Sequence, residues 1–144
     1  MLMPDDLIIK SNCSLSLIRL HAKFDSSIIA SKKIDKKNVS RWGILDFKKM
    51  DGKNFVLKDV IEKPSIKLAP SNYAVIGRYI LPRKIFKILK KQRPGRGGEI
   101  HITDAIRTLI KQKNKFIGHV FDGKYLDCGT MKGYMNSTIE ISKL

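Results

Sequence analysis

The chain has 144 residues, which is enough for one compact domain with its own hydrophobic core. Hydrophobic residues make up 42% of the sequence, the mean hydropathy is −0.20, and no run approaches the roughly 18 apolar residues of a membrane span. The net charge of +16 indicates either an anionic partner or a solvated basic surface. We favour the solvated surface, because the bases are spread along the whole chain and no nucleic-acid motif accompanies them.

The first nine residues, MLMPDDLII, are typical of the end of a buried strand followed by an acidic turn. We therefore expect that further sequence precedes them. The same residues carry acids where an export signal would carry bases. Cys13 and Cys128 lie far apart without CxxC spacing, which favours free thiols in a reducing compartment, and we expect the cytoplasm.

The rest of the chain alternates between helical and extended periodicity. Helices are expected at 14–24, after Pro82, from a cap at Thr103 and from about Thr130. Strands are expected at 27–30, 42–47, 55–61, 73–80 and 116–121, with charged or flexible loops at 32–41 and 93–98 and a hairpin turn at Asp51–Gly52. This alternation predicts an α/β sandwich with a mainly parallel sheet, whose ligands lie beyond the carboxyl ends of the strands.

Two charged pieces follow apolar runs. In Pro4-Asp5-Asp6 only one of the two acids can face a site, where its carboxylate could bind Mg²⁺. In Glu62-Lys63-Pro64 the acid could accept hydrogen bonds from sugar hydroxyls, and the lysine could bind a phosphate. Taken alone, a solvated turn and an exposed strand end are the simpler interpretations of these two pieces.

Two glycine-containing pieces complete the pattern. Gly77 within the strand-like run 72–79, and Gly43 after Trp42, each allow a ligand or another backbone to come close. In the run from Leu126 to Thr130, Asp127 precedes a turn and a helix start, where a metal or a phosphate can bind. A plain helix cap at Thr130 explains the same residues.

Together and in this order, the pieces MPDD, WGIL, VIEKP, LAPSNYAVIGRYIL, GGEIHITDAI and YLDCGTMKGYM resemble bacterial glucose-1-phosphate uridylyltransferases. The resemblance covers about residues 3 to 138 and is most specific from Ile61 to Ala105. It implies a Rossmann-like nucleotide-diphospho-sugar transferase fold, a three-layer sandwich with a mixed, mainly parallel sheet. It also implies the reaction UTP + glucose 1-phosphate → UDP-glucose + pyrophosphate, assisted by Mg²⁺.

The resemblance also implies roles for individual residues. Asp5 and Asp127 would hold the metal, and Asp5 and Lys63 would be the catalytic pair. Lys63 would also bind the sugar phosphate. The remaining residues expected at the sugar are Gly43, Glu62, Asn72, Val75 and Gly77. Glu99, Thr103 and Asp104 match a family segment, but no contact is assigned to them.

One family feature has no counterpart in these residues. The glycine-rich GxGTR-type loop that wraps the nucleotide phosphates is not found, and the RPGRGG run at 93–98 occupies a different family position. We therefore interpret residues 1–144 as one domain, the sugar-phosphate-binding half, inactive alone. The expected partners are the substrates and either a second copy of the chain or a complementing N-terminal fragment, with no membrane and no nucleic acid. The alternatives are another sugar-phosphate nucleotidyltransferase and a basic nucleic-acid-binding module without enzymatic activity.

Overall fold

The computed structural model describes all 144 residues. Four α-helices, two short 3₁₀-helices and seven strands follow one another along the chain. Their order is β1 (Asp6–Ile9), α1 (Cys13–Phe24), β2 (Ser27–Lys33), η1 (Lys36–Arg41), β3 (Gly43–Asp51), β4 (Asn54–Glu62), β5 (Tyr73–Ile80), α2 (Ile85–Lys91), η2 (Arg96–Gly98), α3 (Ile102–Lys111), β6 (Phe116–Val120), β7 (Lys124–Asp127) and α4 (Met131–Ile141). None of the helices has the length and apolar composition that crossing a membrane requires.

Most of the expected helices and strands are confirmed. Two differences concern residues 32–41 and the first three residues of the chain. The expectation of a charged loop over 32–41 is wrong, because β2 continues to Lys33 and η1 spans Lys36–Arg41, which leaves only residues 34 and 35 as a connection. Ser31 explains the longer strand: its buried hydroxyl donates to the Ala74 carbonyl at 2.9 Å, and pairing with β5 continues to Lys33. At the N-terminus the expected extended segment is present, because residues 1–3 bond to the backbone of β5, but its expected burial is wrong, since Leu2 remains 64% exposed.

The strands form a mixed sheet in the order β2-β5-β3-β4-β6, and β6 pairs in turn with β2, so that the circuit closes. Strands β1 and β7 form a separate antiparallel pair. The α/β class and the mixed sheet are confirmed. Within this chain, however, only β2 and β6 run parallel. The tight hairpin between β3 and β4 makes that pair antiparallel, because two residues cannot carry the chain back to a parallel start.

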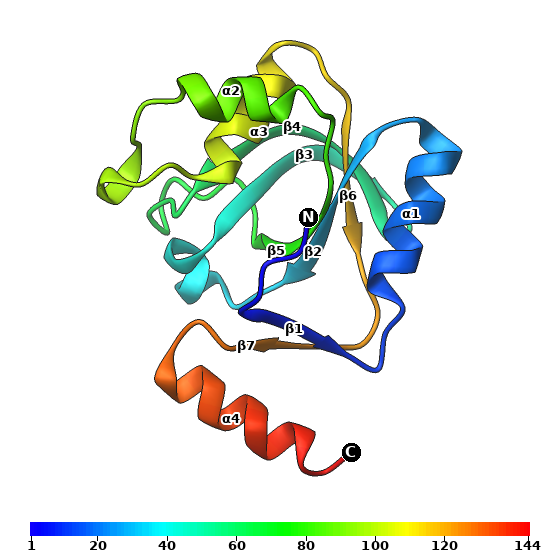
Figure 1. Ribbon diagram of the computed structural model, residues 1–144, viewed down its shortest axis with the longest axis vertical. Helices are drawn as coiled ribbons and strands as arrows, with labels where there is room; N and C mark the ends of the chain where they lie inside the picture. The colour runs from blue at the N-terminus through cyan, green and yellow to red at the C-terminus, as the bar shows by residue number, and fades with distance from the viewer.

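Helices cover both faces of the sheet, as the expected three layers require (Figure 1). Successive residues of β2 point to opposite faces: Ile28 packs in the cluster that includes Leu17 of α1, and Ile29 in the cluster that includes Ile106 of α3. All four side chains are at most 1% exposed. Burying each contributes about 1.5–3 kcal/mol, which fixes the helices on the sheet.

Candidate functional site

The open end of the β3–β4 hairpin brings three of the predicted site residues together. Gly43, the first residue of β3, pairs directly with Glu62, the last residue of β4. Lys63 continues from there, and its backbone N–H donates to the Trp42 carbonyl at 3.0 Å. The expectation that hairpin pairing would assemble these residues is confirmed.

Glu62 lies almost buried, with 11% of its side chain exposed. Thr103 of α3 donates its hydroxyl to Oε2 of Glu62 at 2.5 Å. The other oxygen, Oε1, lies 3.5 Å from Nδ1 of His101 and 3.8 Å from Nζ of Lys63. A carboxylate has about four acceptor positions, so Glu62 keeps capacity for hydroxyl donors from a ligand.

Gly43 must be a glycine because three side chains crowd the place where a Cβ would stand. That atom would lie 2.7 Å from Cγ2 of Thr103, 3.2 Å from Oε2 of Glu62 and 3.4 Å from Cγ2 of Val75. The backbone of Gly43 can therefore approach a ligand closely beside Glu62. Val75, on β5, forms the apolar wall next to it.

Asp5 and Asp127 converge although they stand near opposite ends of the chain. The β1–β7 pairing and a hydrogen bond of 2.8 Å from the Cys128 N–H to the Asp5 carbonyl align the two segments. A Cβ placed on Gly129 would lie 3.0 Å from Oδ2 of Asp5 and 3.3 Å from Oδ1 of Asp127. Both carboxylates therefore face the same point, as expected from the sequence.

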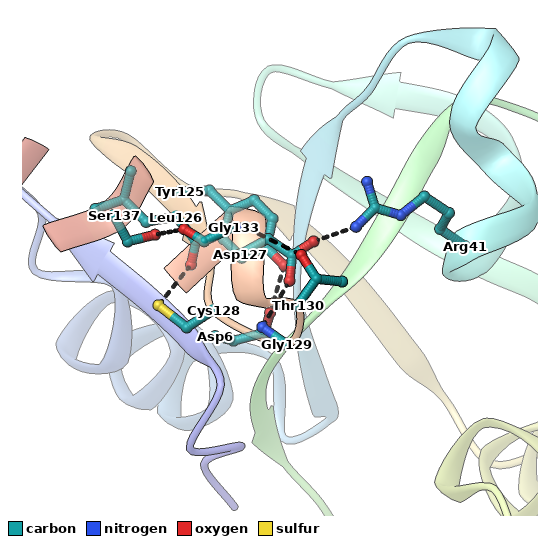
Figure 2. Close-up of polar contacts among 10 residues, drawn as sticks. All are labelled: Asp6, Arg41, Tyr125, Leu126, Asp127, Cys128, Gly129, Thr130, Gly133 and Ser137. Atoms are coloured by element: carbon teal, nitrogen blue, oxygen red, sulfur yellow. Dashed lines mark hydrogen bonds and ion pairs between the residues drawn. The ribbon is translucent and has the colours of Figure 1, made fainter. Parts of the chain in front are cut away.

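Asp127 is engaged on both oxygens, as Figure 2 shows. Oδ1 accepts the Gly129 N–H at 3.0 Å, and Oδ2 accepts Nη2 of Arg41 at 2.5 Å. The Arg41 guanidinium also stacks on the Trp42 ring, 4.6 Å from its centroid. At the start of α4, Thr130 accepts the Gly133 N–H, which confirms the expected cap.

Asp6, by contrast, is a structural group. Its Oδ2 accepts the Gly77 N–H at 2.6 Å, and its Oδ1 accepts the Tyr125 hydroxyl at 2.5 Å. Burial is the main cause that raises the pKa of the Asp6 carboxyl, and the two hydrogen bonds oppose that shift. Burial, together with donation to Asp6, raises the pKa of the Tyr125 hydroxyl in turn. Asp6 thus ties β1 to β5 and β7 beside the site.

These groups line one cavity of about 490 Å³. Its titratable lining residues include four acids and two bases: Asp5, Asp6, Glu62, Asp127, Arg41 and Lys63. An excess of carboxylates repels a phosphate unless a cation is also present. Asp5 and Asp127 suit Mg²⁺, which commonly binds one or two protein carboxylates and completes its shell with water and substrate phosphates. No group of three or more potential ligands from His, Cys, Asp or Glu occurs in the chain.

Two residues predicted at the sugar, Asn72 and Gly77, do not line the cavity, and one predicted helix cap is at another residue. Asn72 donates its side-chain amide to the Ile34 carbonyl at 2.9 Å, outside the cavity. Gly77 is close to another segment, because a Cβ there would lie 2.4 Å from both Asp6 and Met3. Thr103 is not the helix cap, since α3 begins at Ile102 after the N-cap residue His101.

Four residues near or in the cavity were not anticipated. Arg41, Trp42 and Tyr125 line it, with the Arg41 guanidinium stacked on the Trp42 ring. His101 contacts Glu62. Arg41 and Trp42 directly precede Gly43 in sequence, which is the signal that could have drawn attention to them. Tyr125 and His101 give no such signal, because only the folded chain brings them to Asp6 and Glu62.

Comparison with known proteins agrees with this geometry. The chain matches the family described as "Nucleotidyl transferase" over residues 1–143. It is 38% identical over 130 residues to a UTP–glucose-1-phosphate uridylyltransferase of Komagataeibacter xylinus, covering 90% of this chain and 45% of the relative. It is 35% identical over 142 residues to the corresponding enzyme of Bacillus subtilis, covering 98% and 48%.

Among solved structures, a UDP-glucose pyrophosphorylase complexed with UDP-glucose superposes with a TM-score of 0.91 and 37% identity. The superposition covers 99% of this chain and 55% of the other. The chain therefore spans about half the length of the relatives it matches.

Proposed function

This chain belongs to the nucleotidyl transferase family, and we propose that it holds the sugar phosphate in the reaction UTP + glucose 1-phosphate → UDP-glucose + pyrophosphate. The observation that carries the proposal is one cavity that unites Gly43, Glu62 and Lys63 with Asp5 and Asp127. The uridylyltransferase relatives support this choice of reaction. For location we infer the cytoplasm, and for partners a second copy or a complementing N-terminal fragment.

In this proposal each cavity residue acts on one part of glucose 1-phosphate. Glu62 accepts hydrogen bonds from sugar hydroxyls, held in place by the Thr103 hydroxyl. The sugar ring lies against the Gly43 backbone and the Val75 side chain, which both line the cavity. The Lys63 ammonium binds the phosphate, so that one phosphate oxygen is presented to the α-phosphorus of UTP.

In the same proposal Asp5 and Asp127 would hold Mg²⁺. The bound ion would supply positive charge for the phosphate oxygens and for the charge that develops during transfer. Asp5 is the catalytic carboxylate of the pair, and Asp127 completes the site at the start of α4. The reaction forms a bond between the sugar phosphate and the UMP moiety and releases pyrophosphate.

Calorimetric titration of the purified chain with glucose 1-phosphate in the presence of Mg²⁺ tests the proposal. We expect saturable binding that Glu62→Gln and Lys63→Met each weaken at least about tenfold, because both contacts are charge-assisted. Lys67→Met is the matched control: it removes the same charge from a residue that does not line the cavity. Wild-type affinity in both cavity variants would show that the sugar site is assigned wrongly.

Ligand variation then separates the proposed substrate from other sugar phosphates. Glucose without its phosphate should bind more weakly than glucose 1-phosphate, and Lys63→Met should shrink that difference. Galactose 1-phosphate differs in one hydroxyl and should lose part of the Glu62-dependent affinity. If galactose 1-phosphate binds more tightly than glucose 1-phosphate, the chain belongs to a transferase for another sugar.

A further inference from the structure

The proposed function gives no role to the ion pair between Arg41 and Asp127. It joins η1 to the end of β7, with 48% of the arginine side chain and 26% of the aspartate side chain exposed. Nη2 of Arg41 lies 2.5 Å from Oδ2 of Asp127, and both groups are charged, so the contact is a charge-assisted hydrogen bond. Figure 2 shows Arg41 reaching across to Asp127 at the turn before α4.

This contact engages the carboxylate that the proposed cation would also need. Oδ1 of Asp127 accepts the Gly129 N–H, and Oδ2 accepts Arg41. A guanidinium and a divalent cation at one carboxylate repel each other, because both carry positive charge. Arg41 at Oδ2 therefore opposes a cation at Asp127, and a bound cation favours the arrangement in which Arg41 has left.

The phosphate of the proposed sugar substrate is a second anion that Arg41 can bind. Arg41 and Lys63 are the two basic residues that line the cavity, and the Lys63 N–H is bonded to the carbonyl of Trp42, the residue next to Arg41. The planar fork of arginine donates to two oxygens at once, which suits a phosphate as well as a carboxylate. A phosphate in this cavity could therefore be bound by Arg41 as well as by Lys63.

We propose that Arg41 is a further substrate-binding residue, which pairs with Asp127 in the free protein and transfers to the sugar phosphate when a divalent cation takes its place. The inference rests on the proposed function. It predicts that cation and sugar phosphate strengthen each other's binding, because each favours the arrangement in which Arg41 has left Asp127. The competing interpretation is a half-exposed surface ion pair with no bearing on ligands.

Mn²⁺ binding, followed by the loss of its free-ion electron paramagnetic resonance signal, tests the competition. Arg41→Met removes the competitor and should bind Mn²⁺ about threefold more tightly than the wild type, or better. Lys132→Met is the matched control, since Lys132 lines the neighbouring cleft with Asp127 but forms no ion pair with it. We expect the control to stay within about twofold of the wild type, because exposed charges without contact are largely screened.

Trp42 supplies a second readout that a general charge effect would not change. It is the only tryptophan in the chain, and the Arg41 guanidinium lies on its ring. Titration of the wild type with Mg²⁺ should change the Trp42 emission as Arg41 moves away. The same titration of Arg41→Met should leave the emission constant, whereas Lys132→Met should behave as the wild type.

Titration of glucose 1-phosphate with and without Mg²⁺ measures the coupling. In the wild type Mg²⁺ should tighten glucose 1-phosphate binding, and in Arg41→Met this gain should fall at least about threefold. Arg41→Lys keeps the charge but not the planar fork, so it should retain part of the Mg²⁺-dependent gain in affinity. Retention of that gain shows that the loss in Arg41→Met is not caused by a folding defect. If Arg41→Met and the wild type bind Mn²⁺ with equal affinity, and the Trp42 emission of the wild type does not change with Mg²⁺, this inference is overturned and the proposed function is not. Absence of cation binding in every variant overturns the proposed metal site as well.

Discussion

Asp6 offers the sharpest test of how this fold is held together beside its site. Its carboxylate is the common acceptor for the Gly77 N–H on β5 and the Tyr125 hydroxyl on β7. Asp6→Ala would leave both donors without a partner while Gly77 remains buried. Asp6→Asn keeps the shape, because its oxygen can accept from Gly77 and its amide can donate to the oxygen of Tyr125.

The two substitutions should differ clearly in cost. Leaving one buried donor unsatisfied costs about 1–3 kcal/mol, so Asp6→Ala, which leaves two, should lower the free energy of unfolding by about 2–6 kcal/mol. A domain of this size has about 5–15 kcal/mol in total, so the loss is a large share. Asp6→Asn should cost no more than about 1 kcal/mol at neutral pH, because both hydrogen bonds have replacements.

The wild type and Asp6→Asn should also differ in their dependence on pH. Burial raises the pKa of the folded Asp6 carboxyl above its ordinary value of 3.8, so the folded state binds its proton more tightly than the unfolded state. The stabilisation from this group is therefore complete below 3.8 and is lost as the pH rises through the higher folded-state value. Asp6→Asn lacks this titration and serves as the reference.

Urea unfolding followed by circular dichroism, at intervals from about pH 4 to about pH 7, measures both effects. The stability of the wild type relative to Asp6→Asn should fall as the pH rises across that range. A relative stability that rises instead would mean that the hydrogen bonds to the carboxylate outweigh its burial. If Asp6→Ala unfolds at the same urea concentration as the wild type, the tie between β1, β5 and β7 contributes nothing.

Three further predictions concern the site and the cysteines. Gly43→Ala should cost about 1–3 kcal/mol of stability and weaken glucose 1-phosphate binding in calorimetry, because its Cβ would stand 2.7 Å from Thr103; unchanged values would contradict this. Thr103→Val removes the donor to Glu62 and should weaken the same binding about fivefold, whereas Thr103→Ser should restore it. Burial raises the pKa of the Cys13 thiol to about 11, so iodoacetamide at neutral pH should modify Cys128 first, as mass spectrometry would show; equal rates would refute this.

The sequence was most informative where local pattern and pairing agree. The alternation of apolar and charged residues on either side of Asp51–Gly52 defined a hairpin, and a hairpin necessarily returns Glu62 to Gly43. The order of the motifs indicated the family and the likeness to its sugar-binding half. Asp5 and Asp127 were correctly expected to converge, but for another reason: Asp5 precedes β1 and Asp127 ends β7, and the antiparallel pairing of these two strands brings them together.

Tertiary structure alone decided how the individual side chains are used. The sequence treated Asn72 and Gly77 as ligand contacts, whereas Asn72 bonds to Ile34 and Gly77 makes room for Asp6 and Met3. It gave no role to Arg41, which lies 86 positions from Asp127 yet forms an ion pair with it. Such contacts depend on which segments cross in space, and no local periodicity records that. Helices, strands and turns follow from interactions between near neighbours in the chain, whereas the charge balance of a cavity follows from side chains that only folding brings together.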